Sequence, residues 1–150
     1  MIEFKNEDIF EQKTEVIVNT VNCVGVMGKG IALQFKKAFP NNFQEYKKMC
    51  DTGKLKAGVM LITKTNQLLP KYIINFPTKR HWRNKSQLTD IELGLVSLVK
   101  EVERFGIKSI AIPPLGCGNG GLDWSIVKPL IVYAFTPLKQ VNVIILEGKK

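Results

Sequence analysis

The stretch VNTVNCVGVMGKGIA, residues 18–32, decides the fold of this 150-residue chain. A β-branched, apolar run over residues 15–21 predicts a buried strand, and residues 30–39 predict an amphipathic helix that Pro40 ends. The loop between them carries glycines at positions 25, 28 and 30. Glycines let backbone N–H groups approach an anion closely, and a helix N-terminus adds positive charge. Because the glycine spacing matches neither GxGxxG nor the P-loop, we expect a phosphate-binding loop outside the ordinary nucleotide folds.

Strands and helices continue to alternate along the rest of the chain. The clearest helix begins at the Thr89–Glu92 capping box, has Leu88 and Leu93 as a hydrophobic staple, and ends at Gly106. Its expected buried face is Ile91, Leu95, Leu98, Val102 and Phe105. Further helices are expected from an Asn41 cap to about Gly53 and over residues 124–135, and further strands over residues 59–63, 72–76, 109–113 and 141–146, the first two joined like a hairpin. This order predicts an α/β fold, with a mixed central β-sheet sandwiched between helices, in one domain over residues 1–150.

A second glycine-rich loop, PPLGCGNGG at residues 113–121, follows another strand and precedes another helix. Open α/β sheets bind ligands at the carboxyl ends of their strands. Two such loops at one edge of a sheet could therefore hold an extended diphosphate from both sides. Cys117 in this loop has no histidine near it in sequence, so we interpret it as a small filler rather than a nucleophile.

The formal net charge is +9, from 22 Lys and Arg against 13 Asp and Glu. Such a charge attracts nucleic acid or any phosphate-bearing substrate, although it also fits a basic surface that only keeps the protein in solution. Three widely spaced cysteines without a CxxC pair indicate reduced thiols, and neither a metal nor a cofactor is expected. No apolar run approaches the roughly 20 residues of a membrane span, and the N-terminus lacks a signal-peptide pattern, so we expect a cytoplasmic protein.

Three segments resemble the macrodomain family, namely NTVNCVGVMGKGIA at residues 19–32, NFPTK at 75–79 and GCGNGGLDW at 116–124. More narrowly, they are similar to the macrodomains of the DNA ADP-ribosyl glycohydrolase antitoxins (DarG), over essentially the whole chain. The resemblance implies a macrodomain fold and an enzyme that removes ADP-ribose from thymidine in single-stranded DNA, with ADP-ribose as product. It also implies an antitoxin to a DNA ADP-ribosyltransferase toxin, a DarT-like partner bound through a region expected to be absent from this chain. Two alternatives stay open: a hydrolase of ADP-ribosyl-glutamate on proteins, and a reader that binds ADP-ribose without cleaving it.

The resemblance also implies roles for individual residues. Asp8 matches the acidic position that holds the adenine amino group, and Asn22 matches the asparagine that holds the distal ribose. Lys79 matches a lysine needed for activity, so Lys79 and Asn22 are the expected catalytic residues. A related protein-glutamate glycohydrolase pairs that lysine with an aspartate, but the corresponding position here is Gly120, with Asp123 three residues on. The residues expected to bind ADP-ribose are Asp8, Ile9, Asn22, Met27, Gly28, Lys29, Gly30, Ile31, Thr78, Pro114, Leu115, Gly116, Cys117, Gly118, Asn119 and Gly120.

Breaking a ribosyl C1″–N bond passes through an oxocarbenium-like centre, so the site must fix the ribose, neutralise the diphosphate and supply or remove a proton. Lys79 could act as an acid for the leaving base, as an electrostatic partner, or as a nucleophile at C1″. The basic and aromatic run KRHWRNK, residues 79–85, could contact a DNA strand, or it could be a solvated loop with one anchoring tryptophan. Its candidate DNA contacts are Arg80, His81, Trp82 and Arg83.

Overall fold

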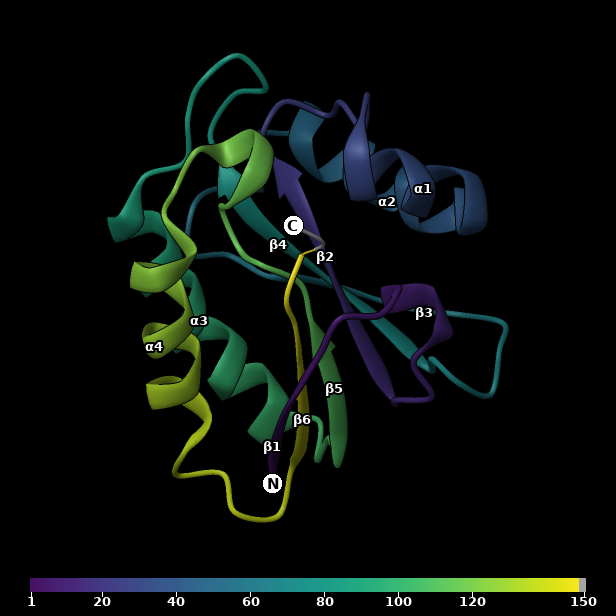
Figure 1. The fold of residues 1–150 in the computed structure, drawn as a ribbon. Coiled ribbons are helices and arrows are strands. Elements are labelled where there is room, and N and C mark those ends of the chain that lie inside the picture. The colour runs from purple at the N-terminus through teal and green to yellow at the C-terminus, as the bar shows by residue number, and fades with distance from the viewer. Residues whose placement is uncertain (149–150) are drawn as a thin grey trace.

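A six-stranded mixed sheet forms the centre of the molecule (Figure 1). The structure is a computed structural model that describes residues 1–148. In the order of the sheet, its strands are β1 (Ile2–Lys5), β6 (Asn142–Leu146), β5 (Ser109–Ile112), β2 (Val16–Asn22), β4 (Tyr72–Lys79) and β3 (Leu61–Lys64). Neighbouring strands run parallel from β1 to β4, and β3 pairs antiparallel with β4 at one edge. The carboxyl ends of β5, β2 and β4 therefore lie side by side.

Helices cover both faces of this sheet. They are α1 (Gly30–Ala38), α2 (Pro40–Asp51), α3 (Leu88–Arg104) and α4 (Trp124–Phe135), with 3₁₀ turns η1 (Ile9–Glu11) and η2 (Gly118–Gly120). The pair α3 and α4 packs on one face, and the pair α1 and α2 lies on the other (Figure 1). The predicted three-layer α/β/α sandwich is thus confirmed. No helix within residues 1–148 is both long enough and apolar enough to cross a membrane.

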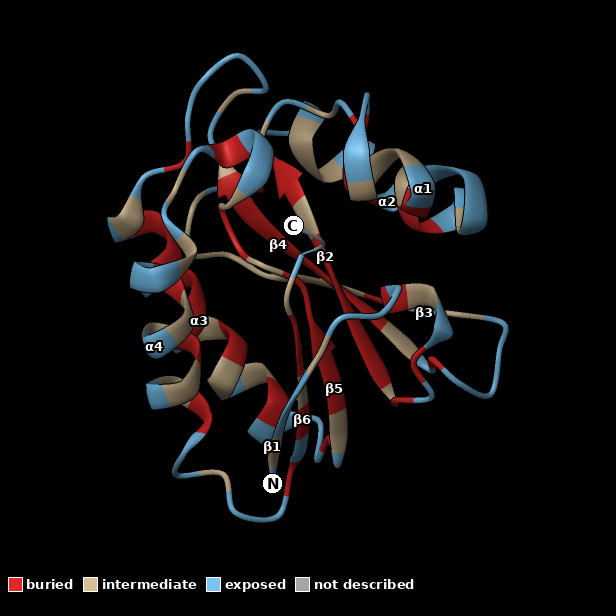
Figure 2. Cartoon of the chain, in the orientation of Figure 1, coloured by how far each residue is buried: buried red, intermediate tan, exposed pale blue. Residues whose placement is uncertain are grey.

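Alternating side chains along β2 join the sheet to both helical layers. Val18 lies in one apolar cluster with Leu98 of α3 and Ile131 of α4, whereas Ile17 lies in another with Phe35 of α1. Successive side chains of a strand point to opposite faces, so a strand buried on both faces is apolar at consecutive positions. Figure 2 shows β2 and β4 buried along most of their length. The loop that leaves the end of β2 therefore starts from a rigid base.

Several boundaries differ from the predicted ones. The helix over residues 124–135 and the hairpin-like pairing of β3 with β4 are confirmed. Asn41 is not a cap, because α2 begins at Pro40, whose fixed φ and missing N–H suit the first helical position. Strand β4 continues to Lys79, three residues beyond the predicted end. The sequence does not predict β1, an edge strand whose two central side chains are exposed and whose apolar pattern is correspondingly weak.

The capping box predicted at Thr89 is wrong. Gln87 has the extended backbone of an N-cap, and its carbonyl oxygen accepts from the Ile91 N–H at 3.3 Å, so Thr89 already lies inside the first turn. Leu93 is 57% exposed and cannot serve as a hydrophobic staple. The predicted buried face is confirmed at Ile91, Leu95, Leu98 and Val102. Phe105 is 40% exposed because it lies at the C-cap, beyond the last turn that packs on the sheet.

Candidate active site

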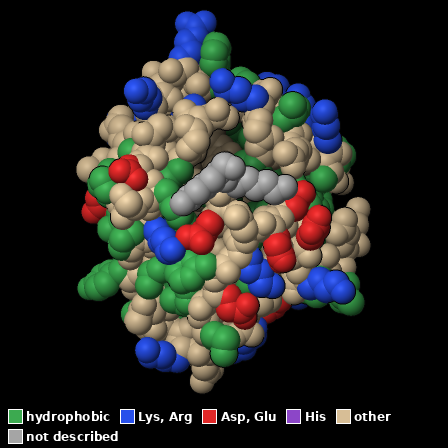
Figure 3. All heavy atoms as spheres, viewed as in Figure 1, with side chains coloured by type: hydrophobic (Ala, Val, Ile, Leu, Met, Phe, Trp, Pro, Cys, Tyr) green, Lys and Arg blue, Asp and Glu red, His purple; other side chains and the backbone are tan. Residues whose placement is uncertain are grey.

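The carboxyl ends of β2, β4 and β5 open into one cleft of about 830 Å³. Its walls combine both glycine-rich loops with the end of β4 and the loop that follows it. In Figure 3, Lys and Arg side chains gather along the upper margin of the molecule, toward which these strands run, and most Asp and Glu side chains of this face lie lower. The cleft therefore lies at the more basic end of the molecule, which suits an anionic ligand.

Asn22, the last residue of β2, holds the first glycine loop through its side chain. Its Oδ1 accepts from the N–H groups of Val24 at 3.1 Å and Val26 at 3.4 Å, and its Nδ2 donates to the Val26 carbonyl at 2.7 Å. The hydroxyl of Tyr46 on α2 donates to Asn22 Oδ1 at 2.7 Å and to its carbonyl oxygen at 2.8 Å. Burial raises the pKa of the Tyr46 phenol, so it remains a donor. The carboxamide of Asn22 has two N–H donors, and the Val26 carbonyl uses one of them. The other remains for a ligand in the cleft, which Asn22 lines.

Helix α1 begins directly after this loop and adds its positive end to the cleft. Its N-cap, Lys29, makes no side-chain capping bond, and the first N–H groups of a helix have no intrahelical acceptor. Ile31 and Ala32 of this first turn line the cleft. Gly30 has a φ of 64°, and a Cβ at this position would lie 3.2 Å from Nδ2 of Asn119. The two glycine loops therefore lie against each other at this point.

The second glycine loop presents an unused backbone donor to the cleft. Among residues 1–148, no backbone group accepts a hydrogen bond from the backbone N–H of Asn119. Gly118 has a φ of 69°, and a Cβ there would meet nothing within 4 Å, so this position is open. By contrast, a Cβ at Gly116 would lie 2.7 Å from Leu122, which makes Gly116 a packing position. Burial, with a smaller contribution from Asp123, raises the pKa of the Cys117 thiol, which favours the interpretation of Cys117 as a filler.

Lys79 is the last residue of β4 and the register partner of Asn22 on β2. The sequence places it just past the strand, whereas the structure includes it in the strand as a partly buried residue that lines the cleft. Burial, followed by the neighbouring charge of Lys29, lowers the pKa of the Lys79 amine. Within the described part of the chain, Lys79 forms no ion pair with a carboxylate. Its amine is therefore free to act on a bound ligand.

Comparison with known proteins identifies this arrangement. The family model of the Macro domain matches residues 18–131, which include both glycine loops and Lys79. The chain belongs to the macrodomain family. The macrodomain of Mycobacterium tuberculosis DarG has a TM-score of 0.98 and 49% identity, with 99% of each chain covered. A structure of Thermosipho africanus DarTG in complex with ADP-ribose has a TM-score of 0.90 and 37% identity over 97% of this chain and 41% of that one.

The curated DNA ADP-ribosyl glycohydrolases that this macrodomain resembles are considerably longer proteins. A protein of Mycobacterium tuberculosis named DNA ADP-ribosyl glycohydrolase is 51% identical over 146 residues, covering 97% of this chain but 42% of the relative. The chain therefore spans about two fifths of the length of such relatives. The resemblance to DarG macrodomains that the sequence predicts is confirmed by both comparisons.

The macrodomain cleft brings most of the predicted site residues together. Those that line it are Asn22, Gly28, Lys29, Ile31, Thr78, Lys79, Trp82, Pro114, Gly116, Cys117, Gly118, Asn119 and Gly120. Those that do not are Asp8, Ile9, Met27, Gly30, Leu115, Arg80, His81 and Arg83. Met27 and Leu115 are buried beneath the loops, which makes them supports of the cleft wall. Asp8 is exposed and caps η1, where it accepts from the Phe10 N–H at 2.9 Å.

The second loop of this macrodomain supplies no acidic partner for Lys79. Asp123 caps α4 and accepts from Ser125 N at 2.9 Å and Oγ at 2.8 Å, and these bonds lower the pKa of its carboxyl. Gly120 packs under Ser86, whose N–H donates to the Gly120 carbonyl at 2.9 Å. A Cβ at position 120 would overlap with Ser86 Oγ and lie 3.1 Å from Ser86 Cβ. An aspartate at position 120 would therefore require Ser86 to shift.

Arg80, a predicted DNA contact, is occupied within the protein. Its Nε and Nη2 donate to Oδ2 and Oδ1 of Asp90 at 3.0 and 3.1 Å, and the Asp90 carboxylate is buried. The Arg80 carbonyl oxygen accepts from the Cys23 N–H of the first glycine loop at 3.3 Å. His81 is also engaged, because its Nδ1 accepts from the Arg83 N–H at 3.1 Å. Of the four predicted contacts, Trp82 is the one whose side chain reaches the cleft wall.

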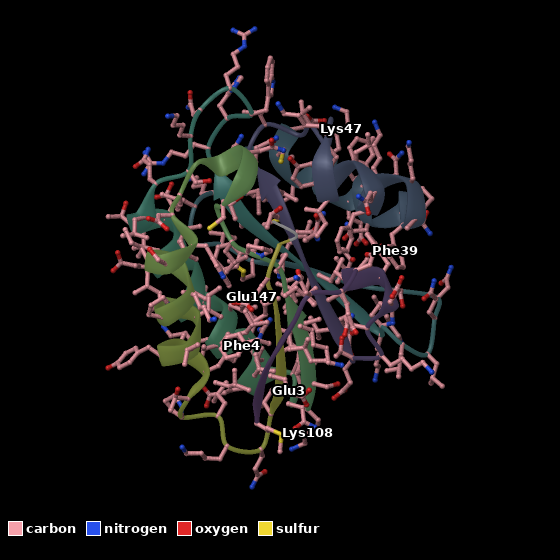
Figure 4. The ribbon with its side chains drawn as sticks, viewed as in Figure 1. Glu3, Phe4, Phe39, Lys47, Lys108 and Glu147 are labelled. Atoms are coloured by element: carbon pink, nitrogen blue, oxygen red, sulfur yellow. The ribbon has the colours of Figure 1, made fainter. Side chains whose placement is uncertain are left out.

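Some lining residues were not among the predicted ones. They are Thr20, Val21, Val26, Ala32, Pro113, Trp124 and Gly148. Trp124 directly follows the second loop, and that position is a signal that could have identified it. Its Nε1 donates to Glu147 Oε1 at 3.2 Å; Figure 4 labels Glu147 beyond the end of β6. Gly148 carries no local signal, since only the pairing of β6 with β5 brings it to the cleft.

No group of three His, Cys, Asp or Glu side chains within residues 1–148 is arranged to hold a metal ion.

Proposed function

We propose that this macrodomain hydrolyses the bond between ADP-ribose and thymidine in single-stranded DNA, as the antitoxin to a DNA ADP-ribosyltransferase toxin. The observation that carries the proposal is the placement of Lys79, which shares the register of Asn22 and lines a cleft between two anion-binding loops. The names of the relatives support the same activity. Residues 1–150 then form one domain that both binds ADP-ribose and catalyses its release.

The diphosphate of ADP-ribose is proposed to lie between the two glycine loops. The first turn of α1 approaches it from one side, and the open backbone at Gly118 with the N–H group of Asn119 approaches it from the other. The distal ribose then extends toward Asn22, whose remaining N–H donor is available to a ribose hydroxyl. This orientation brings C1″ to the end of the cleft that Lys79 lines.

The reaction breaks the bond between C1″ and the base nitrogen. The electron pair of that bond leaves with the base, which takes up a proton, and a water oxygen finally bonds to C1″. Lys79 can protonate the leaving base, stabilise charge, or attack C1″ as a neutral amine that water later displaces. Burial lowers the pKa of Lys79 and so favours the neutral amine, whereas a bound diphosphate favours the charged form. The three roles make different predictions for Lys79→Arg and for the pH dependence of turnover.

The toxin is proposed to be bound elsewhere in a longer protein, through a region outside this chain. The macrodomain covers 42% of the length of its curated relatives, and its cleft accounts for the enzymatic half of an antitoxin. The toxin's product, ADP-ribosylated DNA, is the proposed substrate of this cleft, and free ADP-ribose is its product.

The proposal is tested by offering two carriers side by side. One is a single-stranded oligonucleotide with an ADP-ribosylated thymidine, and the other is a protein with ADP-ribosylated glutamate. We expect release of ADP-ribose from the oligonucleotide and little release from the protein, because no acidic residue pairs with Lys79 within residues 1–148. Release from the protein alone would instead identify the glutamate hydrolase. Binding of ADP-ribose in calorimetry without release from either carrier would identify a reader.

A further inference from the structure

Trp82 lies three residues beyond Lys79, and its side chain serves none of the roles assigned so far. It lines the cleft, yet 45% of its surface is exposed. The indole belongs to none of the apolar clusters of the described core. Tryptophan is enriched at recognition surfaces, where it offers a large flat area. The exposed ring therefore indicates a contact with something that enters the cleft.

The neighbours of Trp82 add positive charge and flat groups. The guanidinium of Arg83 lies over the indole ring at 4.7 Å from its centroid, and the His81 ring centroid lies 5.2 Å away. Arg83 and Lys85 are themselves exposed on the same loop. Aromatic rings that stack on bases, flanked by cations that meet phosphates, are the usual means by which proteins hold single-stranded nucleic acid.

The loop that carries Trp82 is attached to both glycine loops. At its start, Arg80 is fixed by the buried Asp90 and accepts from the Cys23 N–H of the first loop. At its end, the buried Ser86 donates to the Gly120 carbonyl of the second loop. These contacts fix both ends of the loop relative to the ADP-ribose site, so that its indole is held in place before a ligand arrives.

We propose that Trp82 is a stacking platform for the nucleobase that carries the ADP-ribose, and that it selects nucleic-acid carriers over amino-acid carriers. This inference rests on the proposed function, in which C1″ lies beside Lys79. A thymine leaving C1″ has a flat face that can stack on the indole, whereas a glutamate side chain has none. Positive charge alone would attract the phosphates of ADP-ribose on either carrier. Stacking on the indole would distinguish a DNA carrier from a protein carrier, which the basic surface cannot do.

The effect should appear with modified DNA and not with free ADP-ribose. Base stacking on an aromatic side chain typically changes binding by about tenfold to a hundredfold. We expect Trp82→Ala to lower kcat/KM for the ADP-ribosylated oligonucleotide by this factor, and Trp82→Phe to lower it less. Calorimetric affinity for free ADP-ribose should change by less than about twofold in both variants, since the glycine loops are unaltered. Tyr133→Ala is the matched control, because Tyr133 is an aromatic residue on α4 that is 83% exposed and does not line the cleft.

Two outcomes would contradict the stacking role of Trp82 without contradicting the proposed enzymatic function. Unchanged turnover of modified DNA in Trp82→Ala would show that the ring contacts no base. An equal loss of affinity for free ADP-ribose would show that Trp82 holds ADP-ribose itself. Failure of the proposed function looks different, because wild type would then release nothing from DNA. In that case the ratio of affinities for modified oligonucleotide and free ADP-ribose, measured in wild type and Trp82→Ala, still decides whether the indole recognises the base.

Discussion

Asn22 and Lys79 are register partners at the ends of two neighbouring parallel strands. The pairing of β2 with β4 is regular from Val16 to Val21, which lies opposite Pro77, and it then skips Thr78. Such an extra residue re-aims the side chains that follow it. Without the skip, Asn22 would lie opposite Thr78, and Lys79 would project toward the other face of the sheet. One inserted residue therefore brings the two expected catalytic side chains to the same side of the cleft.

Replacement of Lys79 separates attack by its amine from the roles that need its charge. If the amine attacks C1″, Lys79→Arg should be as inactive as Lys79→Ala, because a guanidinium stays protonated. If only its charge is needed, Lys79→Arg should retain a measurable fraction of activity. The measurement is single-turnover release of ADP-ribose from modified single-stranded DNA at matched occupancy. Full activity in Lys79→Ala would remove this residue from the mechanism.

The pH dependence of the reaction provides a second test of Lys79. Burial lowers its pKa below the usual 10.5, so a nucleophilic amine predicts that kcat/KM rises about tenfold per pH unit and levels off at that lowered pKa. An acid role predicts the opposite slope. Lys29→Ala removes the second cause of the shift, and it should move the rising limb to higher pH. If the rising part of the pH profile of kcat/KM does not move in Lys29→Ala, a group other than Lys79 controls it.

Asn22→Ala should reduce turnover more than it reduces affinity for ADP-ribose. In the proposed function the asparagine orients the ribose at the reacting carbon, whereas the diphosphate supplies most of the binding. Tyr46→Phe is the informative companion, because it removes only the hydroxyl that donates to Asn22. Loss of this buried bond should lower the free energy of unfolding by about 1 kcal/mol and reduce kcat severalfold. Urea unfolding and single-turnover kinetics measure the two effects; normal kcat in Tyr46→Phe would mean that Asn22 needs no such support.

Gly118→Val should abolish ADP-ribose binding, since a side chain at this open position would enter the space of the diphosphate. The residue has a φ of 69°, so the substitution also strains the backbone. Gly53→Val is a closely matched control, with a φ of 68° and nothing within 4 Å of an added Cβ. We expect both variants to lose similar stability in thermal unfolding. Retained binding by Gly118→Val in calorimetry would exclude this loop from the diphosphate site.

Gly120→Asp should destabilise the fold without creating a functional acid. The new Cβ would overlap with Ser86 Oγ, and overpacking of this kind costs about 1–3 kcal/mol. Ser86→Gly in the same chain removes the overlapping atoms and should recover most of that loss, as a double-mutant cycle of unfolding free energies would reveal. Independent, additive effects of the two substitutions would contradict the packing described for this loop.

The sequence predicts the parts of the site that depend on local pattern. The apolar run before Asn22, the glycines and the helix that follows are all signals within one short segment, and the structure contains them in that order. The second loop is equally local. The resemblance, rather than the pattern, identifies Lys79, and the strand predicted from the pattern ends at Phe76, three residues before it. Pro77 is accommodated because it lies beside the skipped residue, where the regular ladder ends.

The contacts that position these parts could not be predicted in the same way. The ion pair between Arg80 and Asp90 joins a loop to a helix, and the burial of the Asp90 carboxylate depends on tertiary packing, which no sequence window displays. The contact between Ser86 and Gly120 joins segments 34 positions apart and depends on how two loops meet above the sheet. A sequence pattern therefore indicates which groups can bind a diphosphate, whereas only the folded arrangement shows that a side chain at Gly120 would meet Ser86.

The attachment of the tryptophan loop at Arg80 and Ser86 has a consequence for how this fold can diverge. The loop is attached at Arg80 through its carbonyl oxygen and its bond to the buried Asp90 carboxylate, and at Ser86 through its backbone N–H. Neither attachment depends on the identity of the residues between Arg80 and Ser86. Residues 81–85 can therefore be substituted without loss of either attachment. If Trp82 recognises the base as proposed, mutations in this segment can change the preference for DNA over protein carriers without changing the affinity for ADP-ribose.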